Sequence, residues 1–320
     1  MSVIERIGLA GLVPVVVIND AGDAEATAKA LLKGGLDVME ITMRTVAGLD
    51  AIRKVRQNCP EMLVGAGTVL SVNKAKEAVN AGAQFIVAPG FNPDVVTWCI
   101  KHEIPITPGC VTPSEIEKAL SFGLKIVKFY PADVYGGVKG CKALYGPYQS
   151  EGVKFIPTGG VDLSNLSDFV SRPFIHAVGG GFLCKTEDIA AHNFDTIADT
   201  TQKAVEILLG FQFEHMGINA DSGEESMEAV GLFEKAFGFR PQYGVNSNFS
   251  SPFLEITKAV GLGQHGHIAV KTNSIPRAIH YLKRRGVDVD MDTAKYKGEK
   301  MIAVYLKEEY AGFAVHLLEK

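Results

Sequence analysis

Residues 124–133 read LKIVKFYPAD, an apolar run with a lysine near its end. Successive side chains of a strand face opposite sides, so Lys128 shares a face with Ile126 and Tyr130. Pro131 offers no backbone N–H to a sheet and is expected to end the strand. Burial among apolar neighbours would favour the neutral amine of Lys128, the form that attacks a carbonyl to make a Schiff base. The alternative, which this stretch favours by itself, is a lysine that extends its ammonium group into water.

Seven other short apolar runs alternate with helical patterns along residues 1–210. The expected strands are 12–18, 38–43, 62–64, 85–88, 105–107, 124–129, 154–156 and 174–178. The expected helices are 23–33, 49–57, 72–80, 93–102, 113–121, 138–145, 165–170 and 193–209. Eight β-α units in roughly 210 residues predict an α/β fold, a (β/α)8 TIM barrel. An open, doubly wound sheet is the alternative, although no G-x-G-x-x-G opens a first helix, as a dinucleotide-binding fold would require.

A barrel of this kind carries its chemistry at the carboxyl ends of its strands. The candidate residues at those ends are Glu40, Arg44, Thr68, Pro89, Lys128, Thr158, Gly159, Gly160, Gly180 and Gly181. Glycines after the last two strands leave backbone N–H groups free at the place where barrels often bind phosphate. No lysine or arginine lies within either glycine motif, so backbone recognition of phosphate is expected.

Several of these residues have a structural alternative when each is taken alone. Glu40 and Arg44 could form an ion pair, Thr68 could cap the helix that follows it, and Gly159-Gly160 could be a tight turn. It is harder to explain all of them together as structural features, because they combine a strand-end lysine, a strand-end acid and glycines after both of the last strands. The combination therefore favours a catalytic site.

The overall composition excludes several other classes of protein. The chain has 320 residues and a net charge of −4, and neither residues 1–210 nor 211–320 are basic, so no nucleic-acid partner is expected. No apolar run is long enough to span a membrane, and the N-terminus lacks the apolar core of a signal peptide. The five cysteines are scattered and form no CxxC motif. A reduced, cytoplasmic location is therefore expected.

Four motifs give the first 209 residues a specific resemblance. They are VMEITMRT at 38–45, GAGTV at 65–69, VKFYPA at 127–132 and PTGG at 157–160. Together and in this order they resemble the aldolases of 2-keto-3-deoxy-6-phosphogluconate (KDPG) and 4-hydroxy-2-oxoglutarate (KHG). The resemblance implies a class I aldolase domain over 1–210 that cleaves a 2-keto-4-hydroxy acid, such as an Entner-Doudoroff intermediate, to pyruvate and an aldehyde. It also implies no cofactor for this reaction and a homotrimer.

The same resemblance assigns roles to individual residues. Lys128 would form the Schiff base, and Glu40 would move protons through an ordered water. The substrate-binding residues would be Arg44 and Thr68 at the pyruvate carboxylate, Gly159, Gly160 and Gly180 at the phosphate end, and Pro89, Thr158 and Gly181 beside them. One departure concerns Gly179-Gly180-Gly181, because family members that bind phosphorylated substrates commonly have Gly-Gly-Ser there. The choice among KDPG, its galactonate epimer and KHG stays open.

The chemistry of the proposed residues agrees with this implied activity. Cleavage leaves an electron pair next to the carbonyl carbon, and an iminium on Lys128 would accept it without a metal. A buried carboxylate at Glu40 could take the C4 hydroxyl proton and later return a proton to the enamine. Arg44 offers two parallel donors to a carboxylate.

Residues 211–320 contain an internal repeat. A strand that carries a histidine, a helix ended by glycine and further strands occur twice, which indicates two β-α-β-β-β modules. The repeat resembles the vicinal-oxygen-chelate superfamily, which includes glyoxalase I and bleomycin-resistance proteins. That resemblance implies metal ligands at His215, Glu255, His267 and His316, with His316 replacing a usual carboxylate.

Imidazole suits Zn²⁺, Ni²⁺ or Fe²⁺, so a divalent transition metal is the expected ion. A module without metal is the alternative. Two other functional hypotheses also remain: a ligand-binding protein with an inactive barrel, and a bifunctional enzyme with a second activity in residues 211–320.

Overall fold

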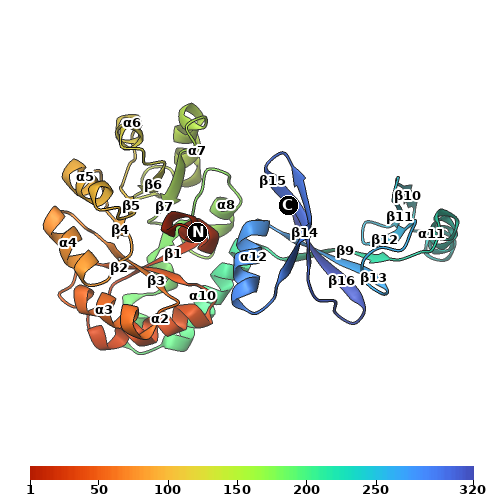
Figure 1. The fold of residues 1–320 in the computed structure, drawn as a ribbon, viewed down its shortest axis with the longest axis horizontal. Coiled ribbons are helices and arrows are strands. Elements are labelled where there is room, and N and C mark those ends of the chain that lie inside the picture. Colours follow the sequence, from red (N-terminus) through yellow and green to blue (C-terminus); the bar gives the residue numbers. More distant parts are fainter. The chain divides into compact units, whose positions relative to one another are not determined.

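The computed structural model describes residues 1–320 and divides them into two compact units, Met1–Leu208 and Leu209–Lys320 (Figure 1). No helix in either unit combines the length and the apolar character that crossing a membrane requires.

The strands of the first unit are parallel and form a barrel-like ring. They are β1 (Leu12–Val16), β2 (Val38–Thr42), β3 (Leu63–Gly67), β4 (Ile86–Val87), β5 (Ile106–Thr107), β6 (Ile126–Phe129), β7 (Lys154–Pro157) and β8 (Val178–Gly180). Six of them form a sheet in the order β5-β4-β3-β2-β1-β8, and β6 pairs with β7. Isolated bridges Gly109–Lys128 and Thr158–Gly179 join this pair to the two edges of the sheet. Neighbours in space are neighbours in sequence, as a barrel requires and a doubly wound sheet does not.

The helices of the first unit surround this ring, as Figure 1 shows for α2 to α7. They are α1 (Val3–Ala10), α2 (Ala24–Lys33), α3 (Gly48–Asn58), α4 (Val72–Asn80), α5 (Pro93–Lys101), α6 (Pro113–Ser121), α7 (Gly137–Tyr148), α8 (Leu166–Val170), α9 (Thr186–Ala190) and α10 (Phe194–Leu209). Aliphatic strand residues such as Val16, Ile41 and Val64 pack with these helices and are fully buried.

Helix α1 was not expected from the sequence. Ser2 caps it by accepting from the backbone N–H of Glu5, whose carboxylate accepts from the N–H of Ser2. Its Ile7 is 1% exposed and packs in one cluster with inward residues of the strands, including Val13, Phe85 and Ile156. The helix therefore closes the amino-terminal end of the barrel with apolar side chains.

All eight strands overlap their expected ranges, but none has the expected bounds, and the differences that bear on the site are those of β3 and β8. Strand β3 continues to Gly67, because Gly65 and Gly67 pair with Glu40 and Thr42 of β2. Strand β8 begins at Val178 instead of at residue 174, and Gly179 and Gly180 lie within it instead of after it. Residues 174–177 still reach β7, since Phe155 donates to Phe174 and His176 donates to Phe155, but they form only an isolated bridge.

The second unit is one eight-stranded sheet with two helices. Its order is β10-β11-β12-β9-β13-β16-β15-β14, and β9 and β13 pair antiparallel at the centre. The elements in chain order are β9 (Gln212–Ile218), α11 (Gly223–Phe237), β10 (Pro241–Tyr243), β11 (Ser247–Ser250), β12 (Leu254–Thr257), β13 (Gly266–Thr272), α12 (Ile275–Arg284), β14 (Val289–Lys297), β15 (Lys300–Leu306) and β16 (Phe313–Glu319). Each half of the unit thus runs as a strand, a helix and three strands.

Candidate active site

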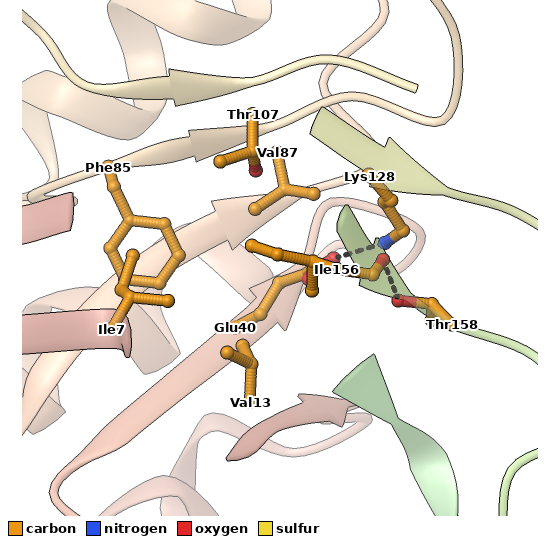
Figure 2. Close-up of a pocket in the computed structure, with 9 residues that line it drawn as sticks. All are labelled: Ile7, Val13, Glu40, Phe85, Val87, Thr107, Lys128, Ile156 and Thr158. Atoms are coloured by element: carbon orange, nitrogen blue, oxygen red, sulfur yellow. Dashed lines mark hydrogen bonds and ion pairs between the residues drawn. The ribbon is translucent and has the colours of Figure 1, made fainter. Parts of the chain in front are cut away.

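Lys128 and Glu40 meet inside the barrel. Lys128 Nζ donates a hydrogen bond to Glu40 Oε1 at 3.4 Å, and the two residues are only 6% and 3% exposed (Figure 2). They come from β6 and β2, on different sides of the ring. The cavity between them is lined by Ile7, Val13, Glu40, Phe85, Val87, Thr107, Lys128, Ile156 and Thr158. Most of this lining is apolar, so a proton donor and a proton acceptor are held together away from water.

Glycine on the neighbouring strand makes room for the Glu40 side chain. A Cβ atom at Gly67 would lie 2.0 Å from Glu40 Oε1, much closer than carbon and oxygen can approach. Gly65 likewise makes room for the ring of Phe85, because a Cβ atom at Gly65 would lie 2.3 Å from the nearest ring atom. The GAG motif of β3 therefore shapes the interior of the barrel, where the sequence suggested only a strand end.

The ion pair between Lys128 and Glu40 stabilises both buried charges. A buried ammonium or carboxylate is costly to desolvate unless it is paired. Lys128 Nζ also lies 5.6 Å from the centre of the Tyr130 ring, close enough for a cation–π contact. Glu40 accepts the hydrogen bond of the Lys128 amine, so a carboxylate lies directly beside the amine inside the barrel. Lys128 does not extend into water, contrary to the alternative from its stretch alone.

A larger pocket of about 320 Å³ opens at the carboxyl ends of the strands, and we call it the mouth. It is lined by Val15, Val17, Arg44, Tyr130, Thr158, Gly159, Gly181, Cys184, Lys185, Thr186 and Glu187. Thr158 lines both the mouth and the inner cavity, so the two adjoin. Glu40 forms its ion pair with Lys128, and Arg44 lies exposed in the mouth. The alternative of a Glu40–Arg44 ion pair is therefore wrong.

Other predicted substrate residues lie at the same end of the barrel but line neither cavity. Thr68 follows β3 with a left-handed φ of 59°, an uncommon conformation for a β-branched residue. Ser71 caps α4, so the capping alternative for Thr68 is wrong. Pro89 follows β4, and Gly180 ends β8 with its Cα against the ring of Phe182.

The Gly159-Gly160 pair forms the turn after β7. Its φ angles are 95° and 66°, which only glycine adopts readily. Gly159 lines the mouth while Gly160 lies against Asp133. The pair is thus both a tight turn and a part of the pocket wall.

Three residues of the mouth were not predicted from the sequence, namely Lys185, Thr186 and Glu187. They follow the glycine run by four to six residues, and only the fold shows that this segment returns to the mouth. Cys184 also lies here, but burial raises the pKa of its thiol to about 12. It therefore stays protonated at neutral pH and makes a poor nucleophile.

The second unit brings the four predicted metal ligands together. His215 of β9, Glu255 of β12, His267 of β13 and His316 of β16 meet at the centre of the sheet. His215 Nε2 and His267 Nε2 lie 3.0 and 3.2 Å from Glu255 Oε2, and one nitrogen of each of the three histidines lies within 4.8 Å of the others. Gly217 leaves space for His267, since a Cβ there would lie 2.1 Å from the imidazole.

The protonation of this cluster suits a cation. Burial alone raises the pKa of the Glu255 carboxyl, but hydrogen bonds from the two histidines outweigh burial and hold it well below its usual range. Burial lowers the pKa of His316 most, the neighbouring His267 and His215 lower it further, and the resulting pKa is about 3. Its Nε2 is buried and has no hydrogen-bond partner in the protein. A neutral, unpartnered imidazole beside a carboxylate fits a divalent transition metal.

Comparison with known proteins concerns mainly the first unit. The KDPG and KHG aldolase family model matches residues 3–200. The 2-dehydro-3-deoxy-phosphogluconate aldolase of Treponema pallidum is 42% identical over 208 residues, which are 65% of this chain and 98% of that protein. The KHG/KDPG aldolase of Escherichia coli K12 is 38% identical, over 61% of this chain and 91% of that protein.

Solved structures agree with these matches. The KDPG aldolase of Legionella pneumophila, with pyruvate captured as a covalent carbinolamine, has a TM-score of 0.60 and 34% identity. That match covers 62% of this chain and 97% of the Legionella chain.

Proposed function

Because this chain belongs to the KDPG and KHG aldolase family, we propose that it is a class I aldolase whose main substrate is KDPG. The products would be pyruvate and glyceraldehyde 3-phosphate, and cleavage of KHG to pyruvate and glyoxylate would be a second activity. The observation that carries the proposal is the buried Lys128 amine, 3.4 Å from the Glu40 carboxylate beneath an open mouth. We assign residues 1–210 to a (β/α)8 aldolase domain. We also propose the homotrimer of the family, for which the mass in solution would be three times 34.4 kDa.

We propose a reaction course in which these residues act from the positions described above. Lys128 Nζ attacks C2 of the keto acid, and loss of water leaves a positively charged iminium. Glu40 takes the proton of the C4 hydroxyl, and the C3–C4 bond breaks as its electrons move into the iminium. The aldehyde leaves and an enamine remains on Lys128. Protonation at C3 and addition of water then release pyruvate and restore the amine.

The remaining polar groups of the mouth would hold the substrate. Arg44 lies in the mouth and can meet the keto-acid carboxylate through two parallel hydrogen bonds. We propose that Thr68, Pro89, Thr158 and the glycines at 159–160 and 180–181 complete the substrate site. A carboxylate held by Arg44 would orient C2 toward Lys128.

An assay of pyruvate release tests this proposal. KDPG, its galactonate epimer and KHG are compared by kcat/KM, each with and without a chelator. We expect the highest value for KDPG and no effect of the chelator, because the iminium replaces a metal as electron acceptor. Absence of pyruvate from all three substrates would refute the proposal, and chelator-sensitive cleavage would reject Lys128 as the electron acceptor.

A second candidate function concerns residues 211–320. We propose that they form paired β-α-β-β-β modules of the vicinal-oxygen-chelate kind, which bind a divalent transition metal through His215, Glu255, His267 and His316. The buried, unpartnered Nε2 of His316 is the observation that favours this. A bound ion would supply a Lewis acid to a ligand with neighbouring oxygen atoms, while Lys128 in the first unit would not need it.

Metal content and stability test the second candidate. Protein purified without a histidine tag should contain or take up one metal ion per chain, and a chelator should lower the melting temperature of the second unit by linkage. His316→Ala should lose the metal, whereas His265→Ala should keep it, because His265 is an exposed histidine outside the cluster. No uptake after incubation with Zn²⁺, Ni²⁺ or Fe²⁺ would establish a metal-free module.

A further inference from the structure

Two cationic side chains reach the mouth from either side of β1. Arg44 follows β2 and Lys185 precedes α9, shortly after β8. The strand order β2-β1-β8 places their strands two spacings apart, about 10 Å, and Val15 and Val17 of the β1 segment line the pocket between them. The mouth therefore presents positive charge at two separated places.

We propose that Lys185 is a specificity residue that binds the phosphate on C6 of the substrate. This inference rests on the proposed aldolase function, in which Arg44 holds the carboxylate at the other end of the same molecule. A six-carbon keto acid phosphate carries one anion at each end, and the mouth offers one cation near each. Gly181, at the end of the glycine run, has no side chain that could donate to a phosphate, whereas Lys185 lines the same mouth with a charged donor.

The surroundings of Lys185 leave its charge available. Lys185 is exposed and forms no ion pair within the protein. Glu187 lines the same mouth and is likewise exposed and unpaired. Its carboxylate would repel a phosphate in the mouth, and a positive group nearby would offset this repulsion. Lys185 is two residues away and lines the same pocket.

The test compares substrates with and without the phosphate. Lys185→Met keeps the length of the side chain and removes its charge, while Lys185→Arg keeps the charge. Lys76→Met is the matched control, because Lys76 is an exposed, unpaired lysine of α4 that does not line the mouth. Each variant is assayed by kcat/KM with KDPG, with unphosphorylated 2-keto-3-deoxygluconate and with KHG.

We expect Lys185→Met to lower kcat/KM for KDPG about 10- to 100-fold, the usual effect of losing a charged hydrogen bond. The values for 2-keto-3-deoxygluconate and KHG should not change, because neither substrate has a C6 phosphate. Lys185→Arg should keep most of the activity, and Lys76→Met should match the wild type. Glu187→Gln should raise kcat/KM for KDPG, since it removes a repulsive carboxylate.

Several results would overturn the inference. Equal losses on KDPG and 2-keto-3-deoxygluconate would show that Lys185 does not read the phosphate, and a loss confined to KHG would assign it to a carboxylate. Unchanged KDPG cleavage by Lys185→Met would show that Lys185 does not bind the substrate. Equal kcat/KM of the wild type for KDPG and 2-keto-3-deoxygluconate would show that the enzyme does not recognise the phosphate. Those results leave the aldolase function intact, whereas a wild-type enzyme that cleaves none of the three refutes that function itself.

Discussion

Replacing Lys128 with alanine is expected to abolish aldol cleavage, with a loss in kcat on the order of 10⁴-fold or more. In the proposed mechanism the amine is both the nucleophile and, as an iminium, the acceptor of the electron pair, and no second amine lines the inner cavity. Lys128→Arg should not restore activity, because a guanidinium stays protonated and does not attack a carbonyl. Lys125→Ala is the matched control, since Lys125 lies three residues earlier and is exposed.

Covalent trapping identifies the reactive lysine directly. The protein is incubated with pyruvate, reduced with borohydride and digested, and the modified peptide is mapped by mass spectrometry. The added mass should lie on Lys128 in the wild type and in Lys125→Ala, and should be absent from Lys128→Ala. A label on any other lysine would disprove the assignment.

Glu40→Gln is expected to lower kcat by about 10²- to 10⁴-fold, the usual contribution of a general acid–base group. The amide has nearly the shape of the carboxylate and can still accept a hydrogen bond from Lys128, 3.4 Å away, but it cannot take up a proton. The variant should therefore still be trapped with pyruvate and borohydride, though more slowly. Near wild-type turnover would assign the proton transfers to another group.

The neighbouring glycine offers an independent way to move the carboxylate without changing its chemistry. Gly67→Ala would place a methyl group 2.0 Å from the present position of Glu40 Oε1, so the side chain must shift. A displacement of about 1 Å typically costs on the order of 10²-fold in rate. Gly90→Ala is the control, because a Cβ at Gly90 meets nothing within 4 Å. Equal activity of the two variants would contradict a precise role for Glu40.

The sequence predicted those features that depend on alternation along a strand. Lys128 and Glu40 face the barrel interior because of their position in short apolar runs, and this parity survives small errors in strand ends. The glycines near the ends of the last two strands were also predicted, although Gly179 and Gly180 lie within β8 and not after it. Their positions in the strands therefore predicted that Lys128 and Glu40 would converge, whereas their proposed catalytic roles rest on the resemblance of the motifs around them.

Features that depend on folding back of the chain were harder to predict. Lys185 is separated from the glycine motif, and only the path after β8 returns it to the mouth. The β-α-β-β-β pattern predicted three strands after each helix, but no apolar alternation marks where β10, β11 and β14 lie, because they are short or polar and most of β10 and many residues of β14 are exposed. Helix α1 did have a local signal, the capping pair of Ser2 and Glu5.

Helix α1 also has a consequence for the order of events in turnover. With Ile7 lining the inner cavity and apolar side chains filling the amino-terminal end of the barrel, molecules enter and leave through the mouth. In the proposed reaction the pyruvate portion would be attached to Lys128 at depth, and the aldehyde portion would lie between it and the solvent. The aldehyde must then depart before pyruvate, and in the condensing direction pyruvate must arrive before the aldehyde. The covalent chemistry requires the same order, so a plug at one end of the barrel adds a steric reason to a chemical one.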